Sequence, residues 1–183
     1  GRILIVPFFV LAFYLPGFYG DLTALILFLI ASFTDFLDGM LARLLGEESK
    51  LGELLDPIAD KIIVAAALIL LVMDGTIRSY EVIAAIIILT REILVSGLRE
   101  FLAEGKIKLP VSNLAKLKTV LQMVSIALLL SGETGNKIIN FQDYNAQTIG
   151  IVLLWLSAAL TLFTGYEYMR KGIDHAISED NKD

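Results

Sequence analysis

The stretch "LTALILFLIASFTDFLDGMLAR" (residues 22–43) runs from mostly apolar residues into Asp35, Asp38 and Arg43. Its first half would suit the middle of a lipid bilayer, which a helix of about 20 mostly apolar residues can cross. Charged side chains within such a helix are costly and are functional by default. The stretch therefore predicts a membrane helix that carries a functional site near one end.

The composition excludes several classes of protein. The chain has 183 residues, of which 56% are hydrophobic and 19% are charged, whereas about a quarter of a soluble domain is charged. It has no cysteine and a single histidine, His175, which argues against disulfides and against a zinc or iron site. The net charge of −5 argues against a basic nucleic-acid binder.

The apolar blocks predict an all-α fold, a bundle of six transmembrane helices in a single domain covering residues 1–183. The expected helices are 3–19, 22–43, 57–74, 79–101, 112–131 and 147–170. Turns are expected at 16–17, 20–21, 46–52 and 74–75, a loop at 131–136, and a disordered tail over about 175–183. The chain begins at Gly1 without an initiator methionine, and we expect a trimmed native N-terminus rather than a signal peptide.

The basic residues predict the orientation in the membrane. Six spans place both termini and the loops 44–56 and 102–111 on one side, and all 15 basic residues except Arg78 and Lys137 lie on or nearest that side. Because basic residues favour the cytoplasmic side, both termini and the aspartates are expected there. We expect a protein of the bacterial inner (cytoplasmic) membrane.

Two pairs of aspartates carry the chemistry. Asp35 and Asp38 are three residues apart, and Asp56 and Asp60 are four apart, so each pair shares one helix face. The helices that carry them are expected to be antiparallel neighbours, so that all four carboxylates converge. Four ionised carboxylates need a counter-charge, and Mg²⁺ binds carboxylates together with substrate phosphates. The pattern predicts a divalent-metal site.

Other interpretations stay open at this point. Asp56 precedes Pro57 and would suit a helix N-cap, and Asp38 and Arg43 would suit an ion pair at a helix end. A divalent-metal transporter also uses intramembrane carboxylates, although here they gather at one membrane face rather than at the midplane.

Written with its spacing, the run Asp35-x2-Asp38-Gly39-x2-Ala42-Arg43-x8-Gly52-x3-Asp56-x3-Asp60 resembles the signature of the CDP-alcohol phosphotransferases. The resemblance implies a six-helix membrane enzyme, usually a homodimer, that moves a phosphatidyl or similar group from a CDP-linked donor to an alcohol and releases CMP. It implies two Mg²⁺ or Mn²⁺ ions on Asp35, Asp38 and Asp56, to which Asp60 also contributes while acting as general base. The residues that it places beside the cytidine diphosphate are Gly39, Ala42, Arg43 and Gly52.

A second stretch, "REILVSGLREFLAEGKIKLPVSNLAKLKT" (residues 91–119), bears on the identity of the acceptor, the alcohol that receives the transferred group. Arg91 and Arg99 share a helix face to within about 80°, and Lys116 and Lys118 open the next helix. Four cations at one depth predict an anion site, because arginine offers forked donors to phosphate and lysine offers a point charge. Alternatively the lysines reach the membrane surface, and Glu92 or Glu81 neutralises Arg91.

This stretch resembles the phosphatidylglycerophosphate synthase branch of the family. The branch implies CDP-diacylglycerol as donor and sn-glycerol 3-phosphate as acceptor, with the acceptor phosphate held by Arg91, Arg99, Lys116 and Lys118. Inositol phosphate, serine or phosphatidylglycerol would be acceptors in other branches. Only Arg2 can remain of an upstream family element, and Ala115 stands where the branch often has glycine. Arg2 and Thr34 are further candidate contacts.

The aromatic residues near the C-terminal end are expected to be structural. Trp155, Phe163, Tyr166 and Tyr168 are expected to face lipid or neighbouring helices, with the tyrosines in an interfacial belt.

Overall fold

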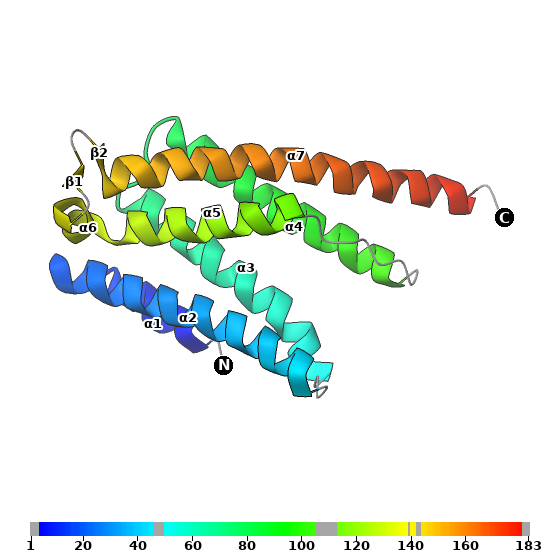
Figure 1. Cartoon of the computed structure of the whole chain (residues 1–183), viewed down its shortest axis with the longest axis horizontal. Helices are drawn as coiled ribbons and strands as arrows, with labels where there is room; N and C mark the ends of the chain where they lie inside the picture. The colour runs from blue at the N-terminus through cyan, green and yellow to red at the C-terminus, as the bar shows by residue number, and fades with distance from the viewer. Residues whose placement is uncertain (1–3, 46–49, 105–112, 139, 142–143, 181–183) are drawn as a thin grey trace.

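The computed structural model is a helical bundle with one very short β pair (Figure 1). Its helices are α1 (Ile5–Ala12), α2 (Phe18–Leu45), α3 (Lys50–Met73), α4 (Glu81–Glu104), α5 (Asn113–Leu130), α6 (Gly132–Ile138) and α7 (Ala146–Asp180). The strands β1 (Asn140–Phe141) and β2 (Tyr144–Asn145) pair antiparallel. The structure describes residues 4–45, 50–104, 113–138, 140–141 and 144–180. Only the backbone is described for residues 35–45, 50–57, 59–60, 103–104, 138, 140–141, 144, 171 and 174–180.

The long helices pack around α5 and α7, which lie side by side along the long axis of the molecule (Figure 1). α4 packs extensively on α7, and α2 packs on α5, α3 and α1. α6 and the β pair lie at one end of the bundle, while the C-terminal end of α2 and the start of α3 lie towards the other end. The two helices that carry the aspartates therefore meet at the end away from α6.

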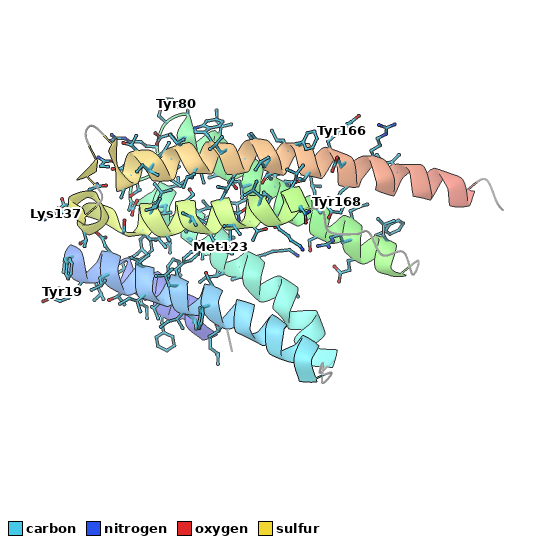
Figure 2. The ribbon with its side chains drawn as sticks, in the orientation of Figure 1. Tyr19, Tyr80, Met123, Lys137, Tyr166 and Tyr168 are labelled. Atoms are coloured by element: carbon cyan, nitrogen blue, oxygen red, sulfur yellow. The ribbon has the colours of Figure 1, made fainter. Side chains whose placement is uncertain are left out.

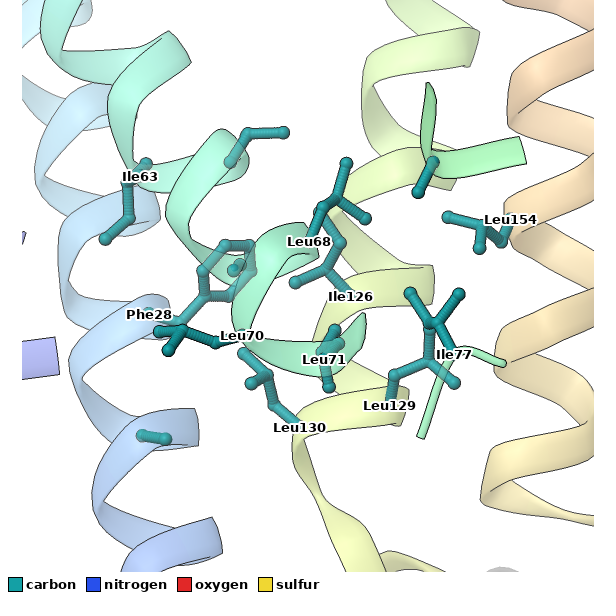
Figure 3. Close-up of a cluster of buried hydrophobic side chains, with 14 of the residues drawn as sticks. Phe28, Ile63, Leu68, Leu70, Leu71, Ile77, Ile126, Leu129, Leu130 and Leu154 are labelled. Atoms are coloured by element: carbon teal, nitrogen blue, oxygen red, sulfur yellow. The ribbon is translucent and has the colours of Figure 1, made fainter. Parts of the chain in front are cut away.

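The core is apolar and contains many small residues. Phe28, Leu68, Leu71, Ile126 and Leu154 are fully buried or nearly so, and they meet between α2, α3, α5 and α7 (Figure 3). Small residues let the helix backbones approach closely, as they do in membrane proteins. The alanines buried in this core are Ala12, Ala24, Ala31, Ala67, Ala84, Ala85 and Ala158.

The outer surface is also apolar. Large side chains such as Phe33, Ile69, Ile86 and Ile93 are more than half exposed, and apolar patches of that extent mark contact with a membrane or a partner. Within the described residues, Asn113–Leu130 and Ala146–Arg170 are long and apolar enough to cross a membrane. Phe18–Thr34 and Lys61–Met73 are shorter apolar helices. These features agree with the prediction of a membrane protein.

Two predicted turns are confirmed and one is wrong; the fourth, 46–52, is wrong only over residues 50–52, and its residues 46–49 lie outside the described residues. Gly17 and Gly75 have positive φ values of 59° and 82° at the expected breaks, a conformation that glycine adopts without strain. Gly20–Asp21 instead lies within α2, and residues 50–52 lie within α3. The N-cap interpretation of Asp56 is therefore wrong, because the helix-forming run from Lys50 to Leu55 extends α3 ahead of Pro57.

The ends of the other helices also differ from the prediction. α1 covers 8 residues rather than 3–19, because the chain turns at residues 13–17 before α2. The segment 131–136, predicted as a loop, contains most of α6. α7 continues to Asp180, so the expected disordered tail is helical over 175–180. The β pair is a small departure from an all-α fold.

Candidate active site

A cluster of polar and charged residues lies where α4, α5 and α7 meet, with Arg99 exposed at its edge. It consists of Arg91, Glu92, Arg99, Lys118, Thr164 and Tyr168. The Glu92 carboxylate lies between two cations: its Oε1 is 3.5 Å from Arg91 Nη1 and also pairs with Lys118 Nζ. The Arg91 and Lys118 side chains are only 12% and 5% exposed. One carboxylate therefore contacts two cations in a poorly solvated place.

α7 fixes the position of the Arg91 guanidinium. Arg91 Nη2 donates a hydrogen bond to Thr164 Oγ1 at 2.9 Å, and Thr164 Oγ1 in turn donates to the Leu160 carbonyl at 2.8 Å. A Cβ atom at Gly165 would lie 3.0 Å from Arg91 Cγ, closer than most real contacts. The absence of a side chain at Gly165 therefore lets the stem of Arg91 cross α7 closely.

Tyr168 lies beneath two guanidinium groups. Its ring centroid is 5.8 Å from Arg91 Cζ and 5.7 Å from Arg99 Cζ, within the range of a cation–π interaction. The side chain is 7% exposed, and it lies towards the end of the bundle away from α6 and Lys137 (Figure 2). The ring holds two like charges near each other, which favours a site for an anion.

A small polar cavity adjoins the cluster between α3, α4 and α5. Its volume is about 30 Å³, and its lining includes Lys61, Glu92, Lys118 and Gln122. Lys61 Nζ donates to Ser96 Oγ, which ties α3 to α4. Lys61 directly follows Asp60 on α3, so the backbone brings the aspartate-bearing part of α3 next to this cavity.

The four predicted acceptor-binding cations do not behave alike. Arg91, Arg99 and Lys118 belong to the cluster, as the sequence predicted. Lys116 is exposed and lies about 200° around α5 from Lys118. It therefore lies on a different face of α5 from the cluster. Glu92 contacts Arg91 but shares its carboxylate with Lys118, whereas Glu81 accepts a hydrogen bond from the backbone N–H of Arg78 at 3.2 Å.

The predicted aspartates lie on two helices, and Asp56 lies within α3 rather than ahead of it. α2 carries Asp35 and Asp38, α3 carries Asp56 and Asp60, and these two helices pack against each other. Because both segments are helical, each pair shares one helix face. The aspartate side chains lie outside the described residues, so the metal site stays a prediction. Among the side chains that are described, no three acidic, histidine or cysteine groups come close enough to hold a metal ion.

The remaining candidate contacts are resolved only in part. The Thr34 hydroxyl donates within α2, to the Ile30 and Ala31 carbonyls at 2.8 and 3.0 Å. The contact predicted for Thr34 therefore stays untested, and its hydroxyl hydrogen is already in use. The other candidates lie outside the described residues or side chains: Arg2, Gly39, Ala42, Arg43 and Gly52.

Sequence reasoning missed Thr164 and the contact of Tyr168 with two arginines. Tyr168 faces a neighbouring helix and Phe163 and Tyr166 are 54% and 69% exposed, both within the expectation of contact with helices or lipid; the interfacial belt stays a prediction. The signal that would have found Tyr168 is its spacing. Thr164 and Tyr168 are four residues apart, so they share one face of α7, and that face meets α4.

Comparisons with known proteins agree with the resemblance noted in the sequence. The family model described as CDP-alcohol phosphatidyltransferase matches residues 1–163. A Rickettsia felis protein named CDP-diacylglycerol–glycerol-3-phosphate 3-phosphatidyltransferase is 41% identical over 169 residues, which cover 92% of this chain and 89% of that protein. Proteins of the same name from Cereibacter sphaeroides and Yersinia pestis are each 38% identical; the matches cover 88% and 92% of this chain, and 86% and 88% of those proteins.

Proposed function

The chain belongs to the CDP-alcohol phosphatidyltransferase family, and we propose that it joins CDP-diacylglycerol to sn-glycerol 3-phosphate, giving phosphatidylglycerophosphate and CMP. The observation that carries the choice of acceptor is the charged cluster. Arg91 and Lys118 are mostly buried and lie beside Arg99, and arginine and lysine gathered at one place suit a dianionic phosphate. The names of the relatives support the same acceptor.

We propose that Asp35, Asp38, Asp56 and Asp60 hold two Mg²⁺ or Mn²⁺ ions. The donor set fits, because all four ligands are hard carboxylate oxygens, and they lie on two helices that pack together. When bound, the ions would offset negative charge on the pyrophosphate of the donor. Gly39 and Gly52 would leave room for the nucleotide, and Ala42 and Arg43 would border it.

In the proposed reaction, Asp60 accepts the proton of the glycerol 1-hydroxyl. The hydroxyl oxygen then attacks the phosphorus that carries diacylglycerol, and the bond from that phosphorus to the CMP oxygen breaks. Arg91, Arg99 and Lys118 hold the acceptor phosphate, and this fixes the distance between the hydroxyl and the donor. Lys116, which is exposed, contributes to attraction of the acceptor rather than to its close binding.

The proposal also covers the membrane. We place the aspartate end of the bundle and both termini on the cytoplasmic side of a bacterial inner membrane, and we propose a homodimer. Helices α2, α3, α4 and α7 have 24 residues or more and α5 has 18, so each is close to or beyond the length needed to span. α1, with 8 residues, extends only about 12 Å; topology mapping tests the proposed six spans.

A comparison of four candidate acceptors tests the proposed function. Purified protein in lipid nanodiscs would receive CDP-diacylglycerol and Mg²⁺, with glycerol 3-phosphate, inositol phosphate, serine or phosphatidylglycerol offered separately. We expect CMP release with glycerol 3-phosphate alone, loss of release with EDTA, and recovery with Mg²⁺ or Mn²⁺. Release with a different acceptor, and none with glycerol 3-phosphate, would reject the proposed acceptor while keeping the aspartate chemistry.

A further inference from the structure

Gln122 has a buried amide oxygen without a hydrogen-bond partner. The residue lies on α5 and is 3% exposed, and its Oε1 has no partner. Buried polar groups are nearly always hydrogen-bonded, because an unmade bond leaves the cost of desolvation uncompensated. The amide oxygen is therefore open to a donor from outside the protein, either a water molecule or a ligand group that displaces it.

The surroundings of Gln122 define what that ligand can be. The residue lines the 30 Å³ cavity beside the charged cluster, and a cavity of that size admits only one or two water-sized groups. Lys61, Glu92 and Lys118 are engaged in the contacts described above. The Thr119 hydroxyl donates to a backbone carbonyl of α5 at 3.1 Å. Gln122 thus offers an unused neutral acceptor in a space that fits one hydroxyl group.

Gln122 also lies at a suitable distance from the phosphate-binding cations. It follows Lys118 by four residues on α5, so the two side chains lie on one face with Cβ atoms about 5–6 Å apart. A ligand whose phosphate contacts Lys118 and Arg91 can place a hydroxyl on the adjacent carbon atom into the cavity. In sn-glycerol 3-phosphate that group is the 2-hydroxyl.

We infer that Gln122 Oε1 accepts a hydrogen bond from the 2-hydroxyl of the acceptor and so determines specificity for a glycerol phosphate. The inference rests on the proposed function, which it deepens by naming a residue that distinguishes acceptors. A site built around a substrate hydroxyl discriminates against an analogue that lacks it, because the polar group of the protein is then left unpaired.

The test compares two acceptors that differ only in that hydroxyl. CMP release by the full chain in nanodiscs would be measured with sn-glycerol 3-phosphate and with 3-hydroxypropyl phosphate, which keeps the reacting hydroxyl. The wild-type protein should prefer glycerol 3-phosphate in kcat/KM by about tenfold or more, the value of one well-placed hydrogen bond. Gln122→Met, which keeps the length of the side chain without its amide, should lower kcat/KM for glycerol 3-phosphate and bring the ratio near one.

A matched control uses the same substitution elsewhere. Gln147 lies at the start of α7, near α6, where its Nε2 donates to the Thr76 carbonyl at 3.3 Å. Gln147→Met should keep the wild-type ratio. Gln122→Asn, which withdraws the amide by one methylene, should also lose the preference and serves if Gln122→Met does not fold.

Each outcome has a distinct meaning. A wild-type ratio near one would overturn the inference without any variant, and so would a folded Gln122 variant that keeps the wild-type preference. CMP release with neither acceptor would overturn the proposed function, and the inference with it. A preference that the wild type shows and both Gln122 variants lose would assign the 2-hydroxyl to Gln122.

Discussion

Replacing Tyr168 with leucine should weaken acceptor binding and leave the chemical step almost unchanged. The ring lies 5.8 Å from Arg91 Cζ and 5.7 Å from Arg99 Cζ. A cation–π contact contributes about 2 kcal/mol when desolvated and about 0.5–1 kcal/mol when exposed. Since Arg91 is nearly buried and Arg99 is exposed, the two contacts together amount to roughly 2–3 kcal/mol.

The expected change in KM follows from that range. If about half of this free energy is lost from the binding of glycerol 3-phosphate, the KM for glycerol 3-phosphate rises about tenfold. A change of 1.4 kcal/mol corresponds to a factor of ten. The kcat should change by less than about threefold, since the arginines bind the acceptor phosphate equally in the ground state and the transition state. Initial rates of CMP release at varied glycerol 3-phosphate and saturating CDP-diacylglycerol would measure both values.

Two control variants separate the role of the ring from general packing. Tyr168→Phe keeps the aromatic face and should stay within about twofold of the wild type. Tyr166→Leu, two residues away on α7 with a 69% exposed side chain, should have no effect on KM. An unchanged KM in Tyr168→Leu would refute the reasoning, as would an equal rise in Tyr166→Leu.

Three further substitutions test neighbouring contacts. Gly165→Ala should raise the KM for glycerol 3-phosphate several-fold, because the new Cβ would lie 3.0 Å from Arg91 Cγ; Gly97→Ala, which meets nothing within 4 Å, is the control and should leave it unchanged. Gly132→Ala should lower the unfolding temperature while KM stays constant, because φ is +53° and the added methyl overlaps an α2 carboxylate. Glu92→Gln should destabilise the fold by roughly 3 kcal/mol, measured by thermal unfolding, because Arg91 and Lys118 each lose a charged partner in a mostly buried place; unaltered stability would contradict that pairing.

Local patterns predicted the long helices because each combines apolar residues with clear turn residues at its ends. They failed where a distant residue decides the structure. α6 contains two glycines and was predicted as a loop, yet the carboxylate of Asp21 on α2, more than 100 residues earlier in the chain, lies against its first residue, Gly132. A contact with a residue so far away in the chain cannot be predicted from the local sequence.

The candidate site also contains residues that the local sequence predicts and residues that depend on helix packing. The aspartate motif could be predicted because it is defined by short spacings within two helices. Arg91 could be predicted as a functional residue because it is a charge within an apolar helix. Its partners Thr164 and Tyr168 could not be predicted, because their contact with Arg91 depends on how α4 packs on α7. Gln122 was equally hidden, because an unpaired acceptor is visible only once its surroundings are known.

The most direct test of the central claim measures the transfer of label from the acceptor into a lipid product. Labelled sn-glycerol 3-phosphate would be incubated with CDP-diacylglycerol, Mg²⁺ and either the wild type or Asp60→Asn, and both CMP and lipid-soluble label would be quantified. The proposed reaction predicts one labelled phosphatidylglycerophosphate for each CMP in the wild type. It predicts neither product above background in Asp60→Asn, with CDP-diacylglycerol binding retained. CMP release without labelled lipid would contradict the proposed transfer, and undiminished turnover in Asp60→Asn would remove Asp60 from the role of general base.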